Sequence, residues 1–153
     1  MRSLGAALAV WVLVGCGTIQ SLSGTGILKV LPHYLDEEGR HTNGPTLLHR
    51  DSYQNKLRNN PQLARSMRYD VNWYGVGEVT LRLELRSNKS GSQPITLEQT
   101  VNSGAGPRHW SSIEIAHDTY LEFGQPYSWK VSLWRGEEML DQDQSFLWID
   151  TGR

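Results

Sequence analysis

The chain has a single cysteine, Cys16, among its 153 residues. A disulfide within the chain is therefore excluded, and the folded body must be stabilised by its own core. An excess of charge is also lacking, since 15 Lys and Arg stand against 16 Asp and Glu, for a net charge of −1. Because proteins that bind nucleic acid carry a basic patch or stripe, we expect no nucleic acid as a partner.

Long hydrophobic runs are scarce as well, and the longest is Leu4–Val14, directly behind Arg2. It is shorter than the ~20 apolar residues that cross a bilayer, and polar residues follow it soon. A positive residue, a short apolar segment and the small residue Gly15 are the three parts of a secretory signal. The sequence therefore predicts a signal peptide over residues 1–15.

The cysteine stands at the end of Leu13-Val14-Gly15-Cys16. This motif resembles the lipobox of bacterial lipoproteins, which directs lipidation of the cysteine and cleavage before it. The resemblance implies that Cys16 becomes the mature N-terminus and carries a diacylglyceryl group, often with a third acyl chain such as palmitate. Since stable anchoring takes two chains, the mature protein would stay on the membrane.

Gly17 follows the cysteine, at the position where an Asp commonly marks retention in the inner membrane of double-membraned bacteria. The resemblance therefore implies the outer membrane, in contact with the periplasm. A plain signal peptide or an uncleaved anchor is the alternative. A plain signal would leave an unpaired thiol in an oxidising compartment, and this favours lipidation.

Residues 16–26 after the cleavage site are small and polar and predict a flexible tether. Ten residues span at most ~35 Å when fully extended. The remaining residues, 27–150, fit a single domain.

Apolar residues alternate with polar ones along most of this domain. The clearest case is Val79–Leu85, whose intervening residues are Thr, Arg and Glu. Such alternation predicts a half-buried strand. Asp51–Asn60 is the one predicted helix, with Asp51 as its cap and Pro61 at its end. Other short strands are predicted at 27–31, 69–73, 95–101, 113–115, 127–133, 139–140 and 146–149.

Seven to eight short strands with regular turns indicate a mainly β fold, an antiparallel β-sandwich with one short helix near residues 51–60. The strand Tyr127–Leu133, which returns through Arg135-Gly136-Glu137, resembles the closing hairpin of immunoglobulin-like and fibronectin type III domains. The likeness covers roughly residues 66–149 and lacks the paired cysteines of true immunoglobulin domains. The stretch His33–Trp73 also resembles an uncharacterised bacterial family, which implies no function.

Three histidines, His33, His41 and His49, recur at a spacing of eight residues. This spacing matches neither one face of a helix nor the short spacings of structural zinc sites. We therefore expect exposed loop histidines and predict no metal or cofactor.

A serine hydrolase needs a nucleophile, a base and an orienting acid. Ser111, Ser112, His117 and Asp118 lie close in sequence. They fall on or beside a predicted strand, where neighbouring side chains point to opposite faces, and no Gly-x-Ser-x-Gly elbow precedes them. We therefore predict no catalytic triad here.

Two tryptophans are candidates for a ligand-binding surface. Trp134 should face outward if Trp129 faces the core, and Trp110 stands beside Arg108 and His109. An exposed Trp next to cationic and polar groups is typical of glycan- and protein-binding patches. The alternative is that another segment covers these rings, because most Trp side chains are largely buried.

Together these observations favour a membrane-anchored envelope lipoprotein with a non-enzymatic binding or scaffolding module. Its expected partners are the membrane, through the lipid, and an envelope protein or glycan. A carbohydrate-binding module is the alternative, and an envelope hydrolase that uses His117, Asp118 or the loop around His109 is a weaker one.

Overall fold

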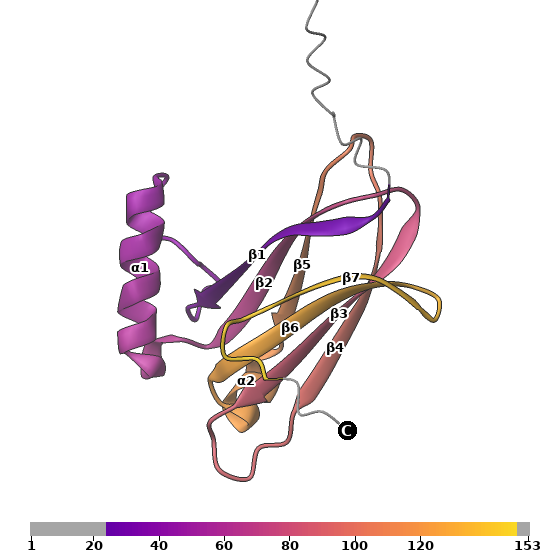
Figure 1. The fold of residues 1–153 in the computed structure, drawn as a ribbon. Coiled ribbons are helices and arrows are strands. Elements are labelled where there is room, and N and C mark those ends of the chain that lie inside the picture. Colours follow the sequence, from indigo (N-terminus) through magenta and orange to yellow (C-terminus); the bar gives the residue numbers. More distant parts are fainter. Residues whose placement is uncertain (1–23, 150–153) are drawn as a thin grey trace, which may run out of the picture.

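The computed structural model describes residues 24–149, so nearly all of the predicted signal peptide and tether lies outside the described residues. The strands are β1 (Gly26–Leu35), β2 (Ser66–Tyr74), β3 (Glu78–Ser87), β4 (Ile95–Asn102), β5 (His109–Ile115), β6 (Pro126–Arg135) and β7 (Glu138–Gln144). The helices are α1 (Leu47–Asn59), α2 (His117–Phe123) and the short 3-10 helix η1 (Pro61–Leu63). Two antiparallel sheets pack face to face, a three-stranded sheet in the order β1-β2-β5 and a four-stranded sheet in the order β4-β3-β6-β7 (Figure 1).

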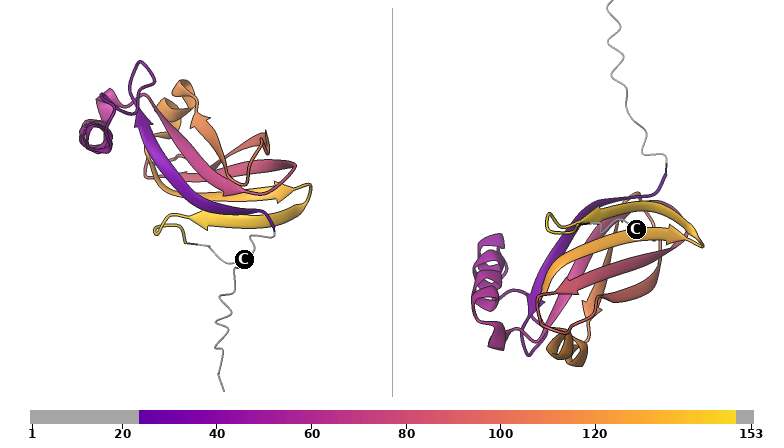
Figure 2. Two further views of the ribbon diagram at one scale, coloured as in Figure 1. Left: turned by 90° about the horizontal axis from the view of Figure 1, so that it is seen from above. Right: turned by 60° about the horizontal axis from the view of Figure 1, so that its bottom comes forward.

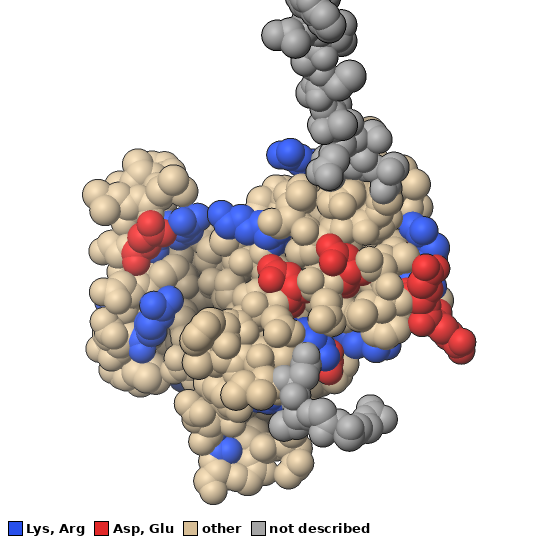
Figure 3. Space-filling model, viewed as in Figure 1, with Lys and Arg blue, Asp and Glu red and all other residues tan. Residues whose placement is uncertain are grey.

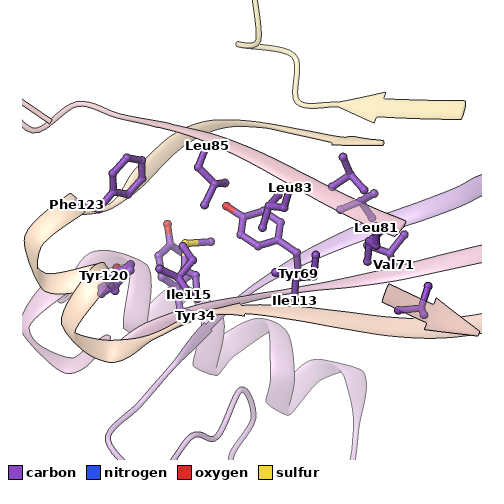
Figure 4. Close-up of a cluster of buried hydrophobic side chains, with 14 of the residues drawn as sticks. Tyr34, Tyr69, Val71, Leu81, Leu83, Leu85, Ile113, Ile115, Tyr120 and Phe123 are labelled. Carbon is purple, nitrogen blue, oxygen red and sulfur yellow. The ribbon is translucent and has the colours of Figure 1, made fainter. Parts of the chain in front are cut away.

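The core lies between the two sheets and follows the alternation of the strands. Leu81, Leu83 and Leu85 of β3 are fully buried, as their pattern predicted. Tyr69 and Val71 of β2 reach toward them from the other sheet (Figure 4). Full burial of one such aliphatic side chain stabilises the fold by about 1.5–3 kcal/mol, so this layer is the main source of stability.

Seven strands in two antiparallel sheets confirm the predicted fold class, a mainly β sandwich. In a constant-type immunoglobulin domain the fourth strand joins the sheet of the first, second and fifth. Here the fourth strand, β4, instead pairs with β3, from Glu78↔Asn102 to Leu85↔Ile95. The predicted closing hairpin of β6 and β7 is also present.

The predicted helix exists, but its start was wrong. It begins at Leu47 rather than Asp51, because the Thr46 hydroxyl accepts a hydrogen bond from the His49 backbone N–H and caps the first turn. Tyr53 and Leu57 share its buried face, as expected from their spacing, and it ends before Pro61.

Two further predictions need correction near the end of the chain. The residues after β5 form a second helix, α2, which was not predicted and which buries only Tyr120 and Phe123. The apolar run 146–149 is not a strand. It forms a turn in which the Trp148 backbone N–H donates to the Ser145 carbonyl, and Phe146 is fully exposed.

The edge strand β1 has its free side covered at two points. The Gln54 side chain of α1 accepts a hydrogen bond from the Tyr34 backbone N–H and donates to the Tyr34 carbonyl. At the other end, the Ile27 N–H donates to Asp141 of β7. Pro32 fits within β1 because a strand at an edge does not need every N–H. These contacts satisfy backbone groups that would otherwise invite pairing with another chain.

The first strand begins at one end of the sandwich, and the helices α1 and α2 lie at the other end. Gly26 begins β1 beside the β2–β3 and β6–β7 turns, where Arg135 donates to the Val76 carbonyl. α1 lies beside the far end of β1, and α2 also lies at that far end (Figures 1 and 2). Among residues 24–149, no helix has the length and apolarity needed to span a membrane.

Candidate functional site

The four residues predicted to bind a ligand do not form one surface. Trp110 is 59% exposed on β5 and Arg108 is exposed beside it, but His109 is buried because successive strand residues point to opposite faces. The His109 ring packs against Trp73 at a centroid distance of 4.7 Å, and its Nε2 lies 3.1 Å from the Gly75 carbonyl oxygen.

Trp134 lies on the other sheet, on the outer face of β6, where it is half-buried. The Arg82 guanidinium stands over its ring at 4.4 Å, and Arg82 also donates to Glu98 at 2.6 Å. Since a guanidinium already occupies one face of the ring, and Trp110 belongs to the opposite sheet, the two tryptophans provide no shared stacking platform.

The residues weighed as a catalytic triad have other partners. The Ser111 hydroxyl accepts a hydrogen bond from the Trp73 indole, while Ser112 on the opposite face donates to Asp70 at 2.6 Å. His117, at the start of α2, bonds through Nδ1 to the Arg65 carbonyl at 2.8 Å. The two hydroxyls therefore engage an indole and a carboxylate, rather than the imidazole that a triad requires.

The most concentrated polar cluster lies on the outer face of the three-stranded sheet and centres on Asp70. Arg68 binds this carboxylate through Nε at 2.8 Å and through a terminal nitrogen at 3.0 Å. His33 Nε2 lies 3.4 Å from it, and Ser112 donates to it. Burial favours the neutral acid, but the hydrogen bonds from Arg68 and Ser112 outweigh it and keep the pKa of Asp70 below its ordinary value.

His33 was expected in an exposed loop and is instead a buried residue of β1, because its ring sits between Asp70 and His41. The rings of His33 and His41 lie 5.0 Å apart. Burial, followed by nearby cationic groups, lowers the pKa of both histidines despite the attraction of Asp70. Since folding lowers these values, the unfolded chain takes up protons first, and we expect acid below pH 6.5 to destabilise the fold.

Asp36 is a second carboxylate that accepts several hydrogen bonds. It directly follows the edge strand β1. It accepts hydrogen bonds from Tyr53 of α1, from the backbone and side chain of Arg40, and from the Glu38 backbone. Burial acts against ionisation, but the bonds from Tyr53 and Arg40 outweigh it and lower the pKa of Asp36 to about 2. Gly39 allows this turn, since its φ of 72° is disfavoured for other residues.

Beside Asp36 lies a cleft of about 480 Å³, within the roughly 300–1,000 Å³ of common ligand pockets. Glu37 and Glu114 bring acidic groups to it, and Arg65 and His117 bring basic ones. Elsewhere, on the face shown in Figure 3, acidic and basic side chains are interspersed. We call the cleft beside Asp36, at the far end of the sandwich from Gly26, the distal cleft.

Sequence reasoning missed Asp36, Arg68 and Asp70. A charged residue on the outer face of a strand is usually solvated, so neither Arg68 nor Asp70 was conspicuous. Their spacing of two residues was the available signal, because it places both on one face of a strand. The contacts with His33 and His41 depend on pairing between β1 and β2, which local spacing does not reveal.

Asp36→Asn should lower the free energy of unfolding at neutral pH by about 1–3 kcal/mol, because Tyr53 and Arg40 lose an ionised acceptor. The native contribution is present above pH 3.8 and is lost as the pH falls toward 2, so the variant should also respond less to acid in that range. Urea unfolding at several pH values measures both effects. Glu38→Gln, at an exposed position of the same turn, is the control and should change stability by less than about 0.5 kcal/mol. Equal loss in the two variants would contradict the role given to Asp36.

Searches with this chain find no matching family model, no matching curated protein and no matching solved structure.

Proposed function

We propose that this protein is a lipid-anchored component of the bacterial cell envelope whose sandwich is a non-enzymatic binding or scaffolding module. The anchor is the lipobox-like sequence ending at Cys16, outside the described residues. With Gly17 after the cysteine, the proposed location is the outer membrane.

The observation that carries this proposal is the separation of the tether from the distal cleft. The chain enters the fold at Gly26, and β1 then runs for 10 residues, about 33 Å, toward α1 and Asp36. A body held at its Gly26 end would therefore present the distal cleft away from the membrane. This is the arrangement expected of a module that reaches a second envelope component.

The chemistry of the polar groups supports recognition rather than catalysis. Asp70 and Asp36 each accept several hydrogen bonds, and the Ser112 hydroxyl donates a hydrogen bond to Asp70. Charges of both signs line the distal cleft, so a polar partner with both acidic and basic groups would complement it. We propose an envelope protein or glycan-linked peptide as this partner.

Site-specific photocrosslinking in intact cells tests the proposal. A photoreactive residue at Glu37, exposed at the distal cleft, should give discrete crosslinked species. The matched control is Thr100, exposed on the outer face of β4, which should give none. Arg65→Glu should weaken the Glu37 crosslinks without unfolding the protein. Crosslinks of equal yield from both positions, or none from Glu37, would argue against a distal binding surface.

A further inference from the structure

Aromatic and basic side chains gather at the Gly26 end of the three-stranded sheet, on its outer face and in the loop that leads into β5. We call this surface the tether-side patch, and it consists of Lys29, Tyr74, Arg108 and Trp110. Lys29 and Arg108 are exposed, Trp110 is 59% exposed and Tyr74 is half-buried. Of the tryptophans in residues 24–149, only Trp110 is exposed, while the others are buried or half-buried.

The strand register creates the patch. Asn72 of β2 pairs with Lys29 on one side and with Trp110 on the other, so the three side chains form a row on the outer face. Tyr74 follows two residues along β2 on the same face. Its ring lies across Gly26, where a Cβ atom would come within 2.7 Å of the Tyr74 hydroxyl oxygen. The absence of a side chain at Gly26 therefore leaves room for this ring to lie against the sheet.

The tether-side patch lies close to the start of the described chain, and this position restricts the partners that it can contact. If Cys16 carries the proposed lipid, the ten residues to Gly26 keep this end of the sandwich within ~35 Å of the membrane at full extension. Val76, 77% exposed in the neighbouring β2–β3 turn, adds an apolar side chain at the same end.

We propose that the tether-side patch rests on the lipid bilayer to which Cys16 is anchored. Trp and Tyr are favoured at the level of the headgroups, since their rings are apolar at one end and polar at the other. Lys29 and Arg108 complement anionic phospholipids. The contact deepens the proposed function and rests on it, because it requires the lipid at Cys16 and holds the Gly26 end of the tethered body at the membrane.

Trp110 is itself the probe for this contact. The mature, acylated protein is reconstituted into vesicles of phosphatidylethanolamine and phosphatidylglycerol whose acyl chains carry bromine, which quenches nearby tryptophan fluorescence. We expect quenching of the native protein and loss of most of that quenching in Trp110→Phe. Trp134→Phe, on the opposite sheet, is the matched control and should retain it. Lys29→Glu combined with Arg108→Glu should also reduce quenching, as should added salt.

The outcomes separate this inference from the anchor. An acylated Trp110→Phe protein that is quenched as strongly as the native protein would overturn the bilayer contact while leaving the anchor intact. A mature protein found by mass spectrometry to lack lipid would overturn the proposed function and the contact with it. Quenching of Trp110 by soluble peptidoglycan fragments, without quenching by brominated lipid, would assign the patch to a glycan and overturn the contact.

Discussion

Trp73→Ala should lower the free energy of unfolding by about 3–5 kcal/mol, the largest stability effect expected for a single substitution in this chain. Trp73 has no exposed surface, packs against the tilted ring of His109 and donates a hydrogen bond from its indole N–H to Ser111. The substitution leaves a cavity between the sheets and an unpaired hydroxyl. Because the free energy of unfolding of small domains is only about 5–15 kcal/mol, this substitution would remove much of the stability of the fold.

Urea unfolding followed by circular dichroism measures this loss, with Trp73→Phe as a milder variant in case the alanine variant does not fold. Trp110→Ala removes the same side chain from a neighbouring exposed position and should change stability by less than about 0.5 kcal/mol. A Trp73→Ala protein within about 1 kcal/mol of the native one would contradict the packing described here.

Cys16→Ser should abolish lipid attachment altogether and leave residues 1–15 uncut, because a hydroxyl does not replace the thiol that forms the thioether. Labelling with an alkyne fatty acid and intact-protein mass spectrometry measure the two effects. The fold should be unchanged, since residues 27–149 form their own core. Normal maturation and lipid labelling of this variant would contradict the lipoprotein interpretation.

Gly17→Asp is the matched variant for the same segment. It should be lipidated as efficiently as the native protein, but its fractionation should shift from the outer to the inner membrane. Unchanged sorting would contradict the outer-membrane assignment while leaving the anchor in place.

Strands with strong alternation were predictable, and the helix boundaries were not. The pattern of Val79–Leu85 predicted β3, because each apolar residue on it is buried between the sheets. α1 was placed too late because Leu47 and Leu48 in its first turn are 69% and 78% exposed, so they extend no apolar face. α2 is only 7 residues long and has no side-chain cap, and so it gives little periodic signal.

The last apolar run shows a limit of hydrophobicity as a signal for strands. Phe146 and Leu147 are exposed, whereas Trp148 is buried with the Arg86 guanidinium 3.9 Å from its ring. Ser145 holds the start of the run, because its hydroxyl accepts a hydrogen bond from the Trp129 backbone N–H. Of the candidate site, sequence reasoning identified exposed Trp110 but not the Asp70 cluster, because that cluster is assembled by pairing between distant strands.

The pairing of β1 with β2 also decides how the sandwich bears load. A pull on the proposed anchor, resisted by a partner at the distal cleft, enters at Gly26 and acts along β1. Register pairs from Gly26↔Tyr74 to Leu35↔Ser66 lie across that direction, so their hydrogen bonds are sheared together rather than opened one after another. The bond from Ile27 to Asp141 shares the force with the second sheet at the point of entry. The antiparallel pairing of β1 with β2 would therefore resist a force directed along β1 as one unit.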